Sequence, residues 1–233
     1  MDNLLSIRSL TKKYGETVAL RDVTIEIPAG RIIGLLGKNG SGKTTLIKIV
    51  SGLLVPDSGE ALIEGDRPGV ITKGKVSYLS ERPYFPSYLK VSDCVDYFAD
   101  FYSDFDRKMA EDMFRDLSVP LDSKLKALSK GTREKVRLVL VMSRRAKLYL
   151  LDEPIAGVDP VAREYILKTV VSAYNKEASV IISTHLIADV EAVLDDYIFI
   201  REGVITEYGS VPKVRETRGI TLDAYFREVF RDA

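Results

Sequence analysis

A glycine-rich segment with one lysine carries the clearest chemical signal in this sequence. The residues GKNGSGKTT, at 37–45, fit the phosphate-loop pattern G-x-x-x-x-G-K-[ST]. Glycines let the backbone aim several N–H groups at one anion, and a helix that begins there adds the positive end of its dipole. In this motif Lys43 reaches the terminal phosphates, and the Thr44 hydroxyl ligates Mg²⁺. The segment therefore predicts a nucleoside triphosphate site, with a chance glycine turn as the alternative. The expected nucleotide contacts in it are Gly37, Asn39, Gly40, Ser41, Gly42, Lys43, Thr44 and Thr45.

Two carboxylates follow an apolar run further along the chain, in KLYLLDEP at 147–154. Asp152, the first, is expected to hold Mg²⁺ through water, and Glu153 is placed where a base could polarise an attacking water. Strands often end in acidic residues, so the pattern is weak alone. Its position downstream of a phosphate loop makes it a strong indication of the second half of the same site.

The only histidine in the chain, His185, ends the apolar run VIISTH. Taken alone, a strand end that happens to carry histidine is the simpler interpretation, because a lone histidine beside an apolar run is more often structural than catalytic.

Short apolar runs of the buried-strand type precede each of these polar groups. They lie at 31–36, 147–151 and 179–183, and helical patterns follow the first run and occupy 160–174. Alternation of strand, helix and strand predicts an α/β fold with a largely parallel central sheet.

The other segments are expected to be additions to one large domain. Strand patterns at 5–10 and 23–27 open the chain, and 1–81 with 147–210 would form the nucleotide-binding core. Residues 82–146 predict a helical insertion, in which Val95, Phe98, Phe101, Tyr102 and Phe105 share one packed helix face. Glu202 and Gly203 mark a hairpin turn, and 211–233 would be a helical tail.

Composition narrows the class of protein. Apolar residues make up 45%, and 34 basic residues balance 34 acidic ones, so we expect no nucleic-acid partner that needs a basic excess.

Cys94 is the only cysteine, which excludes an internal disulfide and a cysteine metal site and predicts a small buried apolar side chain. No metal other than Mg²⁺ is expected. The first residues lack a signal-peptide pattern and no run is long enough to span a membrane, which predicts a soluble or peripheral protein.

The order of these motifs resembles the ATP-binding cassette family, the ATPase subunits of ABC transporters. The resemblance matches Tyr14 to the aromatic residue that stacks on adenine, and LSKGT at 128–132 to the signature motif. It also matches AGVD at 156–159 to the D-loop and His185 to the switch histidine, which contacts the γ-phosphate and helps hold the attacking water. Because the other motifs of the family accompany it, a functional role for His185 becomes the favoured interpretation.

Membership would imply a P-loop core with an antiparallel N-terminal β subdomain and an inserted helical subdomain. Two cassettes would close head to tail around ATP, as a homodimer or with a sibling chain. Ser129 and Gly131 would then contact the γ-phosphate held by the partner, with Asp159 at the interface. A separate transmembrane permease would hold the cassette on the cytoplasmic face of the cell membrane.

Two departures from the family pattern leave the ATPase rate and the strength of ATP-driven closure open. Glu81 stands where the family usually has glutamine; it could still face Mg²⁺ and water, but it adds negative charge near the phosphates. Lys130 and Thr132 replace a glycine and a glutamine of the signature.

The segment after Glu81, ERPYFPSYLKVSD, matches the family's contact region for the membrane subunit. Tyr84, Phe85 and Tyr88 would be interface anchors, or else parts of a self-packed aromatic loop. The tail TLDAYFREVFRD resembles that of small ABC-2-type exporter cassettes, which favours export of a drug, an antimicrobial peptide or a lipid-like cargo. The alternatives are a soluble ABC ATPase that acts on nucleic acid or the ribosome and, less consistent with the signature, a P-loop kinase of small molecules.

Overall fold

Two β-sheets form the framework of the protein. The computed structural model describes residues 3–173 and 177–231. A three-stranded antiparallel sheet has the order β2-β1-β4, with bounds Thr17–Ile27, Leu5–Tyr14 and Ser58–Ile63. A six-stranded sheet has the order β5-β6-β7-β3-β8-β9 and is parallel except for β9. Its strands are Val76–Leu79, Leu148–Asp152, Ser179–Thr184, Ile32–Leu36, Asp196–Arg201 and Val204–Ser210. The expected α/β class with a mostly parallel sheet and an antiparallel N-terminal sheet is confirmed.

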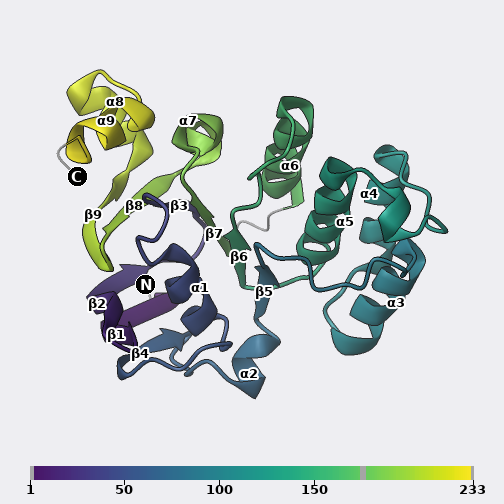
Figure 1. Cartoon of the computed structure of the whole chain (residues 1–233), viewed down its shortest axis with the longest axis horizontal. Coiled ribbons are helices and arrows are strands. Elements are labelled where there is room, and N and C mark those ends of the chain that lie inside the picture. The colour runs from purple at the N-terminus through teal and green to yellow at the C-terminus, as the bar shows by residue number, and fades with distance from the viewer. Residues whose placement is uncertain (1–2, 174–176, 232–233) are drawn as a thin grey trace.

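The helices of the described residues are spread along the molecule (Figure 1). They are α1 Lys43–Val50, α2 Val70–Lys73, α3 Val91–Phe101, α4 Arg107–Asp116, α5 Lys130–Met142, α6 Pro160–Ala173, α7 Ile187–Val190, α8 Val211–Arg218 and α9 Leu222–Val229, with 3₁₀ turns η1 Leu125–Ala127 and η2 Glu191–Val193. Figure 1 shows α3, α4 and α5 together at one end and α8 and α9 at the other. The helix expected at 160–174 is present to Ala173, and Tyr174 lies outside the described residues. Over residues 3–173 and 177–231, none of the helices combines the length and apolar character that crossing a bilayer requires.

The large sheet is buried on both faces at β3, β6 and β7, which explains the near-continuous apolar sequences of these strands, whereas β9 at its edge is partly exposed. Side chains alternate between two cores with the period of two that a strand imposes. Ile33, Leu150 and Ile181 belong to the core shared with α1 and the antiparallel sheet. Leu151 and Ile182 belong to the core shared with α3 to α6 and the tail helices.

The register of the parallel strands aligns their carboxyl ends. Leu36 of β3 pairs with Thr184 of β7, and Asp152 of β6 pairs with Ser183 of β7. Leu79 at the end of β5 pairs with Leu151. The residues that directly follow these four strands therefore emerge at one edge of the sheet, where α/β folds bind their ligands.

A β-hairpin and the helices α8 and α9 follow one another at the C-terminal end of the described residues. Glu202 and Gly203 connect β8 to β9, and both have positive φ angles, of 49° and 78°. The hydroxyls of Tyr197 on β8 and Tyr225 on α9 donate to the Glu207 carboxylate at 2.5 and 2.7 Å. These bonds join α9 to the edge of the large sheet.

The prediction that Phe101 lies on the packed face of α3 is wrong. Phe98 is 4% exposed but Phe101 is 68% exposed, and it stacks on Tyr97 with ring centroids 4.4 Å apart. The helix ends at Phe101, and Tyr102 has an extended backbone that breaks the helical spacing. Tyr102 and Phe105 therefore reach the core from a loop. Cys94 is fully buried, as expected.

Two substitutions on α3 test this assignment. We expect Phe98→Ala to lower the free energy of unfolding by about 3–5 kcal/mol, because it leaves a cavity in the core. Phe101→Ala on the same helix should change it by less than about 0.5 kcal/mol, since the ring is exposed. Urea titration followed by circular dichroism measures both, and equal losses would contradict the exposed position of Phe101.

Candidate functional site

The turn from β3 into α1 depends on glycine at two close approaches. A Cβ at Gly37 would lie 2.4 Å from the carbonyl oxygen of Ile200. At Gly42, where φ is 107°, it would lie 2.6 Å from the carbonyl oxygen of Ala19. The loop is therefore held tightly between neighbouring backbones at the N-terminus of α1, where N–H groups without helical partners favour an anion.

Lys43 brings a buried cation to the base of this loop. Its side chain is 6% exposed, and Nζ donates to the carbonyl oxygens of Gly37 at 2.8 Å and Lys38 at 3.2 Å. Nζ also lies 3.6 Å from Oε1 of Glu153. Burial lowers the pKa of Lys43, against the opposing charges of Glu153 and Asp152. A phosphate would compete with these carbonyl and carboxylate oxygens for the ammonium group.

Asp152 is a buried carboxylate with one oxygen unpartnered. Its Oδ1 accepts from the hydroxyls of Ser183 at 2.5 Å and Thr44 at 3.2 Å. Its Oδ2 is buried and has no hydrogen-bond partner among the described residues. Burial raises the pKa of Asp152, and the nearby charges of Glu81 and Glu153 raise it further. A cation beside this carboxylate would offset both effects.

Glu153 and His185 meet from adjacent strands. Glu153 follows β6 with a φ of 49°, in the left-handed region that is unfavourable for a non-glycine residue, and its N–H donates to the Ser183 carbonyl at 3.0 Å. Nδ1 of His185 lies 3.1 and 3.2 Å from the two carboxylate oxygens of Glu153. The strained backbone thus aims the carboxylate between Lys43 and His185.

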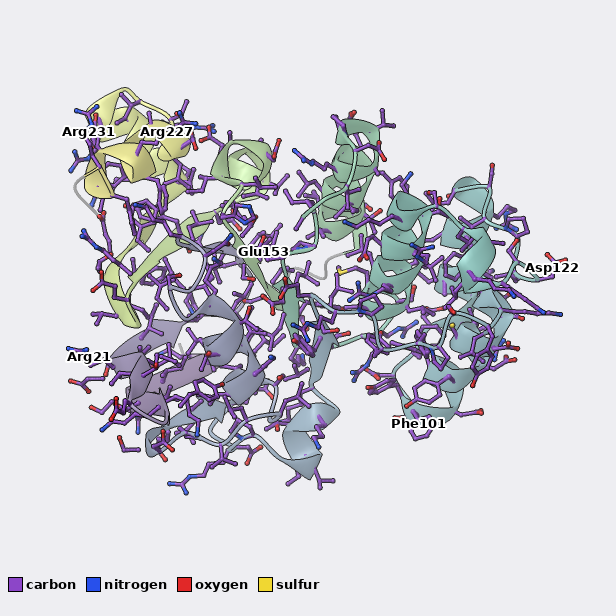
Figure 2. All side chains as sticks on the ribbon, in the orientation of Figure 1. Arg21, Phe101, Asp122, Glu153, Arg227 and Arg231 are labelled. Carbon is purple, nitrogen blue, oxygen red and sulfur yellow. The ribbon has the colours of Figure 1, made fainter. Side chains whose placement is uncertain are left out.

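These groups surround one cavity of about 360 Å³. Figure 2 shows the labelled Glu153 near the middle of the molecule, between the antiparallel sheet and the helices α3 to α5. The cavity is lined by Ala19, Asn39, Gly40, Ser41, Gly42, Lys43, Thr44, Thr45, Glu81, Glu153, Ala156 and His185. The structure therefore brings residues 39–45 of the phosphate loop, Glu81, Glu153 and His185 to one place, and the Thr44 hydroxyl donates to Asp152. Gly37 lies outside this lining, although its carbonyl accepts from Lys43.

The other expected nucleotide contacts lie outside this lining. Tyr14 ends β1 and is 50% exposed, with the ammonium of Lys12 5.9 Å from its ring centre. Ala19 of β2 is the lining residue that the antiparallel sheet contributes. Ser129 and Gly131 do not line the cavity either.

The signature segment contacts the D-loop of the same chain. Ser129 caps α5 by accepting from the Thr132 N–H at 3.1 Å, and the two hydroxyls lie 2.8 Å apart. A Cβ on Gly131 would lie 3.2 Å from Oδ2 of Asp159, and one on Gly157 would lie 2.3 Å from Nζ of Lys130. Lys130 and Thr132 are the two residues that depart from the usual signature. Thr132 contacts the helix cap, and Lys130 contacts the D-loop.

The aromatic segment after Glu81 divides into packed and exposed residues. Phe85 packs against the rings of Tyr84, Tyr97 and Phe98, with centroids 4.6, 5.5 and 6.1 Å away. Tyr84 is 44% exposed and Tyr88 is 67% exposed. The self-packed alternative therefore applies to Phe85, while Tyr84 and Tyr88 keep part of their surface exposed.

Sequence reasoning missed Ser183, whose hydroxyl donates to Asp152 and whose carbonyl accepts from Glu153. A signal was available. Ser183 stands two residues before His185, and the period of a strand places such residues on the same side.

Comparisons with known proteins agree with this geometry. A family model described as ABC transporter matches residues 20–156. The ABC transporter ATP-binding protein YtrB of Bacillus subtilis (strain 168) is 30% identical over 91% of this chain and 74% of its own length. The SkfA peptide export ATP-binding protein SkfE of the same organism is 31% identical, over 91% of this chain and 92% of its own. A solved ATP-binding subunit of an ABC transporter is 28% identical and superposes with a TM-score of 0.86 over 97% of this chain and 99% of that one. With this site and these relatives, the chain belongs to the ABC transporter family, as an ATP-binding subunit.

Proposed function

We propose that this chain hydrolyses ATP with Mg²⁺ to drive a separate membrane permease. One observation carries the proposal: the ammonium of Lys43, the carboxylate of Glu153 and the imidazole of His185 meet in a single cavity at the N-terminus of α1. A cation for phosphate, a base for water and a polar group beside that base are the parts that phosphoryl transfer to water requires.

Mg²⁺ fits the oxygen donors next to this cavity. The Thr44 hydroxyl lies 3.2 Å from Oδ1 of Asp152. Oδ2 of Asp152 accepts no hydrogen bond among the described residues, so it could accept one from a water bound to the cation. Glu81, which lines the same cavity, is a third oxygen donor. Mg²⁺ prefers such donors, completed by phosphate oxygens and water, and when bound it would neutralise phosphate charge.

Glu153 is the residue that we propose as the general base. Its Oε1 lies 3.6 Å from Nζ of Lys43. Nucleotide binding would draw the Lys43 ammonium toward phosphate and leave Glu153 with His185 as its neighbour. His185 would then orient the carboxylate and contact the γ-phosphate.

Ser129, Gly131 and Asp159 would act across a dimer interface. They lie outside the cavity that holds Lys43, so a contact with ATP would have to come from a second cassette. Head-to-tail closure of two copies, or of this chain with a sibling, would place the N-terminus of α5 against the γ-phosphate, where its dipole favours an anion. Tyr14 would stack on the adenine of its own chain.

The partner in the membrane would be a permease, and the direction would be export. Exposed Tyr84 and Tyr88, close to Glu81 in the sequence, are suitable contacts for that subunit, and Phe85 packs against the ring of Tyr84. One relative is named for peptide export, which supports export, and the relatives named as transporter subunits favour transport over the soluble alternative. The chain would lie on the inner face of the membrane through that permease.

Replacement of the base should trap the dimer. We expect Glu153→Gln to convert a monomer to a dimer on addition of Mg-ATP, because binding is kept while hydrolysis is blocked. Light scattering after size exclusion, with and without Mg-ATP, measures this. The double variant Lys43→Ala/Glu153→Gln is the control and should stay monomeric. A Glu153→Gln protein that binds ATP yet remains a monomer would contradict self-association through this signature.

Replacement of the histidine should separate binding from turnover. We expect His185→Ala to keep its affinity for ATP and to lose about 100-fold or more in turnover, a loss of about 2.7 kcal/mol in transition-state stabilisation. Phosphate release and binding of a fluorescent ATP analogue give the two quantities. Turnover close to wild type would return His185 to a structural role.

A further inference from the structure

Arg137 is a buried cation outside the cavity, in the apolar half of α5. The residue is 5% exposed and lies between Val136 and Leu138, both of which belong to the core. A guanidinium in such surroundings is costly unless its donors are satisfied. Its Nε has no hydrogen-bond partner among the described residues, and the partners of its two Nη atoms show what the residue is placed to hold.

Those partners lie on both sides of Glu81. Nη2 of Arg137 donates to the carbonyl oxygen of Ser80, and it lies 3.3 Å from the carbonyl oxygen of Arg82 and 3.4 Å from the Ser80 hydroxyl. The Ser80 hydroxyl in turn donates to the Arg82 carbonyl at 2.6 Å. Nη1 donates to Glu134, one turn earlier on α5, at 2.6 Å.

The segment held in this way has no regular structure of its own. Strand β5 ends at Leu79 and α3 begins at Val91, so the carbonyls of Ser80 and Arg82 have no ladder or helix to pair with. The guanidinium supplies donors to both and fixes the peptide groups that flank Glu81. It also lies 5.9 Å from the ring centre of Tyr84, which extends the contact along the same segment.

We propose that Arg137 is a positioning residue that holds the Glu81 carboxylate in the nucleotide cavity. Glu81 lines that cavity together with Thr44 and Glu153. Because α5 begins at the signature segment, Arg137 also makes the position of Glu81 depend on the position of that helix. The inference rests on the proposed ATPase function, since Glu81 matters only if the cavity performs that reaction.

The competing explanation is a buried arginine that serves stability alone, and the chain contains a matched control. Arg144 is 3% exposed and donates to the carbonyls of Val76 at 2.7 Å and Gly74 at 3.1 Å, at the opposite end of β5. It also pairs with Asp104. Arg144 therefore has the same chemistry and burial as Arg137 but does not touch the residues beside Glu81.

The test compares Arg137→Lys with Arg144→Lys and combines the first with Glu81→Ala, which removes the carboxylate. Lysine keeps the charge but loses the fork, in which Nη2 reaches the carbonyls of Ser80 and Arg82 while Nη1 reaches Glu134. We expect Arg137→Lys and Glu81→Ala each to lower turnover by about 10-fold, and the double variant to be within about 2-fold of Glu81→Ala alone, because residues that act through one another are not additive. Arg144→Lys should lower the melting temperature and leave turnover within about 2-fold.

A second measurement does not depend on activity. Hydrogen exchange of the nucleotide-free protein should be faster over residues 80–86 in Arg137→Lys and unchanged there in Arg144→Lys. Ser80→Ala removes the hydroxyl bridge without disturbing a buried charge and should show the same change more weakly, so it serves if Arg137→Lys folds poorly.

Three results would overturn the proposal: equal turnover in the two lysine variants, losses that multiply in the double variant, or unchanged turnover in Glu81→Ala. Unchanged exchange over 80–86 would also reject it. A wild-type chain that hydrolyses no ATP would instead reject the proposed function, and the exchange measurement would still decide whether Arg137 holds the segment.

Discussion

The parallel register of β5, β6, β7 and β3 is the constraint on which the site depends. Each strand ends beside its neighbour, so the residues that follow them must share one edge of the sheet. The phosphate loop follows β3, Glu81 lies just beyond β5, Glu153 follows β6 and His185 follows β7. A shift of one residue in any pairing would turn the flanking side chains to the opposite face and separate these groups. Burial of the sheet between two apolar cores makes such a shift costly.

The charges at this edge are balanced only in part. Lys43 and the acidic residues Glu81, Asp152 and Glu153 lie together. Burial lowers the pKa of Lys43 and raises the pKa of Asp152, so it favours the neutral form of each group. The site thus keeps one cation against several carboxylates, with one carboxylate oxygen unpartnered among the described residues. Such an arrangement is less stable than an apolar one, as is common at functional sites, and a bound cation with its anionic ligand would relieve it.

Sequence alone predicted the parts of the fold that local pattern determines. The apolar runs before Gly37, Asp152 and His185 indicated strands, and the α/β class and the hairpin at Glu202 are confirmed. The end of α3 at Phe101 could not be predicted, because the helical spacing continues in the sequence beyond the point where the backbone turns. The ion pair of Lys43 with Glu153 and the contact of Arg137 with the Glu81 segment also gave no sequence signal, since each joins residues that are remote along the chain. The roles of the signature, Tyr14 and the exposed tyrosines stay predictions.

The contact of the signature segment with the D-loop has a consequence for any assembly of two copies. Lys130 approaches Gly157, and Gly131 approaches Asp159, all within one chain. The D-loop directly follows the segment that carries Glu153, so this contact connects the proposed general base of a chain to its own signature. In a head-to-tail pair that signature serves the nucleotide of the other chain. The two ATP sites would then be joined through the interior of each subunit as well as across the interface, and occupancy of one would alter the affinity of the other, with a Hill coefficient different from one.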